Sequence, residues 1–142
     1  MSETQDVIQN LSEADSLELL ATKTFGRLVV RLKDDMDLYP LNYVVSEGAI
    51  YFRTAEGSKL FTLTLNHDVL FEADFVDEAE HNAWSVVVKG NAEALKSNAE
   101  IEKADELPLK PWLPTLKYNY VKVTPTSISG RKFKLGQEPE RY

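Results

Sequence analysis

Hydrophobic residues recur along most of this chain at every second position, the spacing typical of β-strands with one buried face. In residues 27–32, for example, Leu28, Val30 and Leu32 share one face of an expected strand. Comparable patterns predict strands over residues 36–45, 49–53, 69–75, 84–95, 118–125 and 128–133. Short strands at such close spacing indicate an antiparallel barrel decorated with a few small helices.

Three segments carry helix signals instead. Ser12 is placed to cap a helix over residues 12–23, and acidic residues follow it in the first turn. A second short helix is expected over residues 58–66, with leucines on its buried side, Leu65 among them. A third, charged helix is expected over residues 97–106.

Two residues mark irregular points within the expected strands. Pro40 cannot donate a ladder hydrogen bond, so it indicates a sheet edge, a bulge or the opening of a strand. Gly90 indicates a bulge or a barrel corner inside the fifth strand. The six glycines are otherwise scattered, without the spacing of a dinucleotide-binding or phosphate-binding glycine loop.

Length and composition fit one globular domain. The chain has 142 residues, of which 43% are hydrophobic, enough to build a core. We expect a flexible N-terminus over residues 1–10, a single domain over residues 11–134 and a polar tail over residues 135–142.

The charge balance argues against nucleic acid and anionic membranes as partners. The net charge is −7, and the nearest approach to a basic cluster is the short run at residues 131–134. The chain has no cysteine, which excludes disulfides, thiolate zinc sites and cysteine nucleophiles. Without a signal-peptide pattern or a long apolar run, a soluble cytoplasmic protein is the expectation.

Hydrolytic triads and metal sites find little support. The two histidines, His67 and His81, lie in polar stretches, and neither belongs to a nucleophile motif. His81 is close in sequence to several acids, but that stretch is typical of a solvated loop. We therefore predict no metal site.

The stretch from Tyr51 to Leu60 is the strongest candidate for chemistry. An expected strand ends in Arg53 and Thr54, a turn follows, and Ser58 and Lys59 then open a helix. A helix N-terminus presents unpaired N–H groups and a partial positive charge, and the added cations and hydroxyls make a plausible phosphate cradle. The alternative is an ordinary strand–turn–helix junction with a capping serine and solvated charges.

A planar ligand could lie beside this cradle if the segment 40–43 pairs with residues 51–54. For Asn42 the alternative is a solvent-facing strand residue, and for Tyr43 a core aromatic. Trp84 alone is typical of a core or interface tryptophan. Trp112, set between two prolines, is typical of an exposed loop aromatic or a lid.

Together these segments resemble a known family, the pyridoxamine 5′-phosphate oxidase-like, FMN-binding split-barrel proteins, and within it the small bacterial flavin-nucleotide-binding subgroup. The resemblance spans residues 11–134. The segments that carry it are Gly26–Leu28, Pro40–Tyr43, Phe52–Leu60, Trp84–Gly90, Leu107–Trp112 and Ile128–Arg131.

The resemblance implies a six-stranded antiparallel split β-barrel and a homodimer with FMN at the subunit interface. The implied phosphate ligands are Arg53, Thr54, Ser58 and Lys59. The residues implied to line the isoalloxazine ring are Pro40, Leu41, Asn42 and Tyr43. Those implied to approach the flavin are Trp84 and Ser85, with Trp112 and Arg131 contributed by the other subunit.

One departure from the family pattern bears on activity. Pyridoxamine phosphate oxidases carry an Arg-x-His element near the C-terminus, and Phe133 stands at that place here. This argues against vitamin B6 oxidation itself and leaves an FMN-dependent oxidoreductase with an unknown small substrate. The alternatives are a non-enzymatic flavin carrier, reservoir or sensor, a protein that binds a deazaflavin (F420) or haem, and a purely structural dimer.

Overall fold

The computed structural model describes residues 7–55, 57–112 and 119–141. Some predicted features lie outside the described residues. These are residues 1–6 of the expected flexible N-terminus, Glu56 in the expected turn, Pro114 in the proline-flanked loop of Trp112, Tyr118 of an expected strand and the side chain of Ser58.

Within the described ranges, the chain forms one eight-stranded antiparallel sheet. Its strands are β1 (Ile8–Leu11), β2 (Phe25–Leu32), β3 (Asp35–Asn42), β4 (Val44–Ser46), β5 (Ala49–Thr54), β6 (Asp68–Asp77), β7 (Asn82–Ala94) and β8 (Asn119–Lys134). The helices are α2 (Glu13–Leu20), α3 (Ser58–Leu65) and α4 (Asn98–Asp105). The predicted helices and the mainly β class are confirmed.

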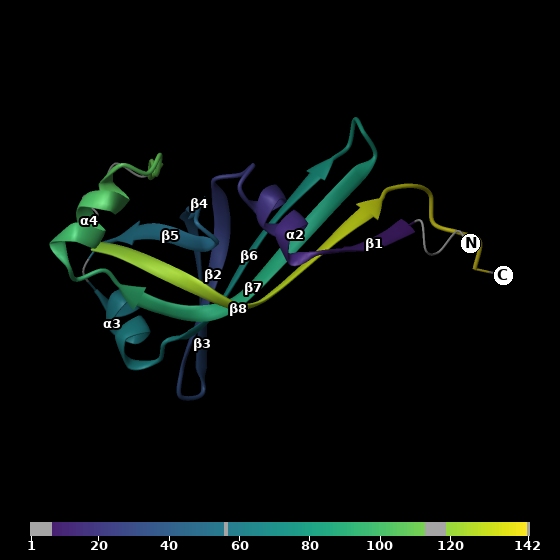
Figure 1. Cartoon of the computed structure of the whole chain (residues 1–142). Helices are drawn as coiled ribbons and strands as arrows, with labels where there is room; N and C mark the ends of the chain where they lie inside the picture. Colours follow the sequence, from purple (N-terminus) through teal and green to yellow (C-terminus); the bar gives the residue numbers. More distant parts are fainter. Residues whose placement is uncertain (1–6, 56, 113–118, 142) are drawn as a thin grey trace.

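The sheet curls into a half-barrel because its two ends are joined through one residue. The strand order is β3-β2-β6-β7-β8-β5-β4, which puts β3 and β4 at opposite ends. In sequence, however, only Tyr43 separates them. The sheet must therefore bend until its ends meet at Tyr43 (Figure 1), and the predicted split barrel is confirmed, although the described residues form eight strands where six were predicted.

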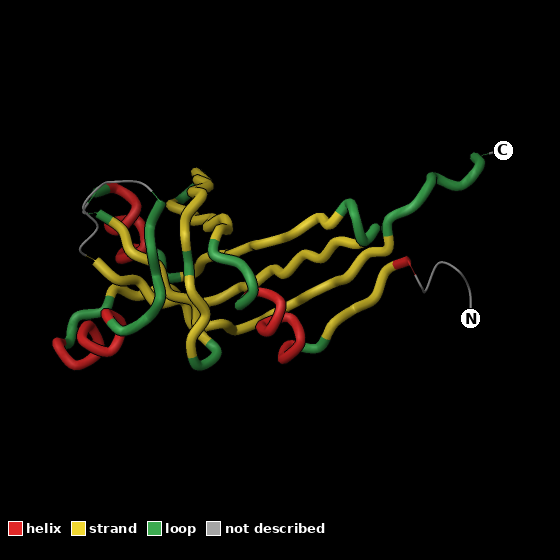
Figure 2. Tube along the Cα trace, turned by 90° about the horizontal axis from the view of Figure 1, so that it is seen from above, coloured by secondary structure: helices red, strands yellow, loops and turns green. Residues whose placement is uncertain are grey.

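Three strands extend beyond the curled part as an arm. The ends of β6, β7 and β8 run out together, β1 pairs with β8 from Ile8↔Phe133 to Leu11↔Gly130, and both termini lie at the far end (Figures 1 and 2). Helix α2 lies against this region and packs on β8, where Gly130 approaches the buried Ser16. Helices α3 and α4 lie at the opposite end of the molecule.

The strand boundaries differ from the prediction in three places. The expected strand 36–45 is broken at Tyr43 into β3 and β4, and β1 was not predicted. The two expected strands 118–125 and 128–133 are one continuous strand. Pro125 does not break β8 because it sits opposite Gly90 at a register shift, where the regular ladder is already interrupted. The bulge predicted at Gly90 is confirmed.

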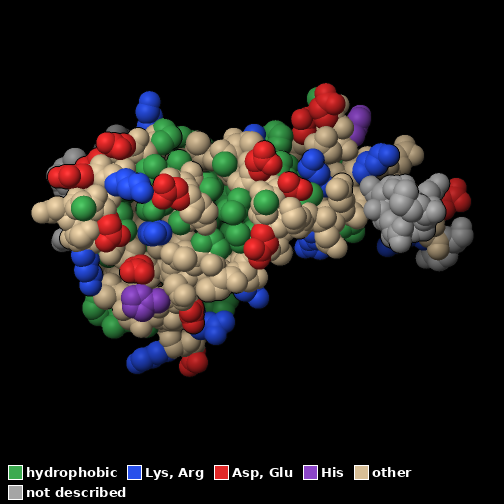
Figure 3. Space-filling view, viewed as in Figure 1, with side chains coloured by type: hydrophobic (Ala, Val, Ile, Leu, Met, Phe, Trp, Pro, Cys, Tyr) green, Lys and Arg blue, Asp and Glu red, His purple; other side chains and the backbone are tan. Residues whose placement is uncertain are grey.

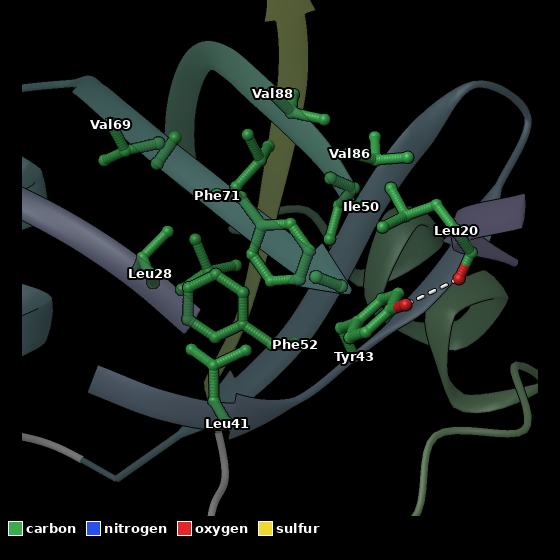
Figure 4. Packing of buried hydrophobic residues seen from close by; sticks show 14 of the residues in the cluster. Leu20, Leu28, Leu41, Tyr43, Ile50, Phe52, Val69, Phe71, Val86 and Val88 are labelled. Atoms are coloured by element: carbon green, nitrogen blue, oxygen red, sulfur yellow. Dashed lines mark hydrogen bonds between the residues drawn. The ribbon is translucent and has the colours of Figure 1, made fainter. Parts of the chain in front are cut away.

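The core lies inside the curl, between the sheet and the helices (Figure 4). Tyr43 is 1% exposed, and its hydroxyl donates to the carbonyl oxygen of Leu20 at 2.5 Å. Its ring meets Phe71 edge to face, with centroids 4.8 Å apart. Leu65, expected to be buried, is 56% exposed, because α3 turns that side of its surface away from the sheet.

Serine side chains cap the N-termini of α2 and α4. The Ser12 side chain accepts from the backbone N–H of Asp15 at 3.1 Å, which confirms the predicted cap of α2. Ser97 caps α4 in the same way by accepting from the N–H of Glu100.

Candidate functional site

The junction between β5 and α3 has the geometry of an open helix start. β5 ends at Thr54 and α3 begins at Ser58, with Gly57 in the N-cap position. Gly57 has φ +154°, a conformation that side chains other than glycine rarely adopt, and it offers no side-chain cap. The first N–H groups of α3 therefore lack the side-chain acceptor that a serine or aspartate at this position would provide.

Arg53 and Thr54 leave β5 on opposite faces, as neighbouring strand residues do. Thr54 is 6% exposed, and its hydroxyl donates to the carbonyl oxygen of Ala55 at 3.2 Å. Arg53 lies opposite Tyr120 on β8, with Cζ 5.8 Å from the centre of that ring. The Tyr120 hydroxyl in turn donates to Asp105 Oδ1 of α4 at 2.6 Å. Burial and this bond raise the pKa of Tyr120.

Two buried hydrogen-bond donors at this end lack a partner. Among the described residues, the Nε atom of Arg53 and the Nδ2 atom of Asn119 are buried without any hydrogen bond. Buried polar groups are nearly always paired, so two unpaired donors in adjacent rungs of the β5–β8 ladder require an explanation. A ligand that carries only acceptor oxygens, such as a phosphate, fits this donor set.

Sequence reasoning missed Asn119, because nothing in a lone asparagine between two tyrosines indicates a ligand. Its position becomes meaningful only through the pairing Thr54↔Asn119. Lys59, which was predicted, extends toward β3, where Nζ lies 4.4 Å from the centre of the Tyr39 ring.

The segment expected to line a flat ring pairs differently from the prediction. Residues 40–42 pair with β2, through Arg27↔Pro40 and its neighbours, and the β4–β5 hairpin reaches only as far as Val44↔Tyr51. The expected pairing of residues 40–43 with residues 51–54 is therefore wrong. The reason is the bend at Tyr43, whose backbone N–H donates to the carbonyl oxygen of Thr24 at 2.9 Å.

Within this segment the side chains have separate surroundings. Leu41 and Tyr43 are buried in the core, whereas Pro40 is exposed on β3. The amide of Asn42 is engaged at both ends. Its Nδ2 donates to the carbonyl oxygen of Thr24 at 3.1 Å, and its Oδ1 accepts from the backbone N–H of Trp112 at 2.8 Å.

The tryptophan loop is attached to the barrel at this point. The Trp112 ring stacks on Phe25 of β2, with centroids 4.9 Å apart and planes 8° from parallel. Trp112 nevertheless remains 66% exposed. The structure thus brings Trp112 and Asn42 together, with Phe25 as a third aromatic neighbour that the sequence did not single out.

The remaining predicted residues lie on the arm. Trp84 is 7% exposed and belongs to the core cluster. Ser85 and Arg131 are direct cross-strand neighbours on β7 and β8. One chain therefore arranges the predicted residues in three groups: at the β5–α3 junction, around Asn42, and on the arm.

A charged network lies on the face of β2 and β6 that points away from the core. Arg27 donates from Nε to Glu72 Oε1 and from a terminal nitrogen to Asp74 Oδ2, both at 2.9 Å. Burial, together with a hydrogen bond to Asp74, raises the pKa of Glu72 to about 7. The pKa of Asp74 is lowered, mainly by its hydrogen bond with Glu72. One proton shared between the two carboxyl groups explains why the pKa of Glu72 is raised and that of Asp74 is lowered.

The face of the molecule drawn in Figure 3 carries charges of both signs. Figure 3 shows acidic and basic side chains interspersed over the visible side rather than gathered in one basic patch. None of the helices formed by residues 7–55, 57–112 and 119–141 is long and apolar enough to cross a membrane. Over the same ranges, no group of three or more histidine, aspartate or glutamate residues is placed to hold a metal ion.

Comparison with known proteins gives this arrangement a family. A sequence model described as pyridoxamine 5′-phosphate oxidase matches residues 12–132. The chain belongs to the pyridoxamine 5′-phosphate oxidase family. The residues that the match spans run from the cap of α2 to the outer part of β8 and include the whole curled sheet.

Individual relatives of this pyridoxamine 5′-phosphate oxidase family member agree. A crystal structure from Corynebacterium glutamicum, provisionally named a pyridoxamine 5′-phosphate oxidase, has a TM-score of 0.86 and 53% identity, covering 97% of this chain and 99% of that one. An FAD-binding protein of Mycobacterium smegmatis has a TM-score of 0.77 and 37% identity, covering 89% of this chain and 99% of that one. An uncharacterized protein of Mycobacterium tuberculosis is 44% identical over 98 residues, covering 69% of this chain and 87% of that protein.

Proposed function

We propose that this protein binds a flavin nucleotide, FMN, and uses it in oxidation or reduction of a small molecule. The observation that carries the proposal is the unpaired donor set at the end of β5, where Arg53 Nε and Asn119 Nδ2 are buried without acceptors among the described residues. Membership of the family and 37% identity to an FAD-binding protein support a flavin as the ligand.

A flavin would supply the hydride or electron transfer itself, so the protein need not provide an acid–base pair. The chain's own contribution would be to anchor the phosphate at Arg53, Thr54 and the start of α3. The edge formed by Pro40 and Asn42 would lie along the ring. Because the predicted residues fall into three separate groups on one chain, we propose that the site is completed in a homodimer, with Trp112 and Arg131 supplied by the second copy.

The first experiment asks whether a flavin binds, and which one. Purified protein should show flavin absorbance bands or quench added flavin fluorescence. FMN should bind more tightly than FAD, since the proposed anchor grips a terminal phosphate. A preference for FAD would keep the flavin and correct the cofactor, whereas protein that binds neither would contradict the proposal. Light scattering of the eluted protein then tests the homodimer.

Arg53→Ala tests the phosphate anchor. Loss of one or two charge-assisted hydrogen bonds, each worth about 1.5–3 kcal/mol, should weaken FMN binding roughly 10- to 100-fold. Arg31→Ala is the matched control, because Arg31 is an exposed arginine on β2. If both variants bind FMN as the wild type does, Arg53 faces something other than the phosphate.

Reduction of the bound flavin separates an enzyme from a carrier. Rapid reduction by NADH or NADPH, followed by turnover with an added electron acceptor, is expected for an oxidoreductase. Binding without such turnover would favour a flavin carrier or sensor on the same scaffold.

A further inference from the structure

We propose that Asn119 is a further ligand of the bound nucleotide, donating its side-chain amide to the phosphate that Thr54 and Arg53 also hold. The inference rests on the proposed function and adds a residue from β8, a strand with no predicted phosphate ligand. The amide belongs to the first residue of that strand.

The state of the amide is the first reason. Asn119 Nδ2 is closed off from solvent and has no hydrogen-bond partner among the described residues. A buried donor without an acceptor is unfavourable. An unpaired buried donor in a native structure calls for an explanation, and the simplest one for an N–H group is that a ligand supplies its acceptor.

The position of the amide is the second reason. Thr54 and Asn119 form the final rung of the β5–β8 ladder, and directly opposed residues share one face of a sheet. Arg53 belongs to the preceding rung and faces the other side, toward Tyr120. Because the ladder stops at this rung, a phosphate bound at the strand end would lie beside both faces.

The surroundings of this strand end favour an anion. Helices α3 and α4 lie on opposite sides of it (Figures 1 and 2), and α3 turns its uncapped N-terminus toward the end of β5. The nearby carboxylate of Asp105 already accepts a hydrogen bond from the Tyr120 hydroxyl at 2.6 Å. A phosphate has enough acceptor oxygens to take donors from Arg53 and Asn119 together.

The test compares FMN with riboflavin, which lacks only the phosphate. Asn119→Ala should weaken FMN binding about tenfold, the loss expected for one hydrogen bond to a charged group, and leave riboflavin binding unchanged. Asn119→Asp should weaken FMN binding more strongly, because it sets a negative charge against the phosphate. Asn98→Asp makes the same change at an exposed position of α4 and should alter neither affinity. Quenching of flavin fluorescence measures all of these affinities.

Thermal unfolding without ligand gives a second readout. Asn119→Ala should melt no lower than the wild type, because the substitution removes an unsatisfied buried donor. A residue with a purely structural role would instead lower the melting temperature when replaced, and that result would count against the proposal.

The possible failures are distinguishable. If the wild type binds FMN and both Asn119 variants bind it equally well, the assignment of Asn119 is overturned while flavin binding stands. If FMN and riboflavin binding weaken equally, the amide contacts another part of the ligand and the phosphate assignment is overturned. If the wild type binds neither flavin, the proposed function falls together with this inference.

Discussion

Replacing Glu72 with glutamine should remove a pH dependence from the stability of this protein. In the folded state the pKa of Glu72 is about 7, against an ordinary value of 4.5, because burial and the hydrogen bond with Asp74 favour the protonated carboxyl. Between these two pH values the folded protein holds a proton that the unfolded chain has released. The stability that Glu72 gains from this proton is therefore fully present below pH 4.5 and is lost as pH rises through about 7.

The size of the effect follows from the same pKa. A rise from 4.5 to about 7 corresponds to an upper limit of about 3.4 kcal/mol, at about 1.36 kcal/mol per pH unit. The Glu72 side chain is still 23% exposed, so water screens part of it, and we expect about 1–2 kcal/mol between pH 5 and pH 8. The lowered pKa of Asp74 acts in the opposite sense, but below its ordinary value of 3.8, outside this window.

Glutamine mimics the protonated carboxyl at every pH. Its oxygen can accept from Arg27 and its amide can donate to Asp74, so Glu72→Gln should match the wild type near pH 5 and exceed its stability at pH 8. Guanidinium unfolding at several pH values measures the difference, and all other titrating groups are common to both proteins. Glu78→Gln, in the exposed turn after β6, is the control. Parallel stability curves for wild type and Glu72→Gln would refute the reasoning.

Two substitutions test the packing. Gly130→Ala should destabilise the fold by about 1–3 kcal/mol, because the added methyl group would collide with the buried Ser16 of α2, whereas Gly136→Ala, with open space around it, should be neutral in the same chemical-denaturation assay. Tyr43→Phe should cost about 1–3 kcal/mol, since it leaves the Leu20 carbonyl oxygen without the hydroxyl that donates to it, and an unchanged melting temperature in calorimetry would contradict this.

The features that could be predicted from the sequence are those with a local cause. The cap at Ser12 and the bulge at Gly90 each depend on the residue itself and a few neighbours. β1 escaped prediction because its residues are mostly exposed and show no alternation. Pro125 misled the prediction of β8, since only the register against β7 reveals that the ladder is already irregular there.

The candidate site shows the same division. Arg53 and Thr54 could be proposed because a strand end, a glycine turn and a helix start are contiguous in the chain. Asn119 could not, because it meets Thr54 only through a pairing between strands that are far apart in sequence. The network of Arg27, Glu72 and Asp74 was missed for the same reason, and so was the stacking of Trp112 on a partner in β2.

The place of β8 in the sheet has a consequence for how the protein is made. β8 follows the other described strands in sequence, yet it is the one that joins β7 to β5 and also pairs with β1. The two parts of the sheet, which are linked in sequence at Tyr43, therefore share no strand pairing until residues 119–134 have left the ribosome, and the edges of β5 and β7 are exposed until then. Chains truncated before β8 should aggregate rather than fold in part, so any shortened version of this protein should keep residues up to Lys134.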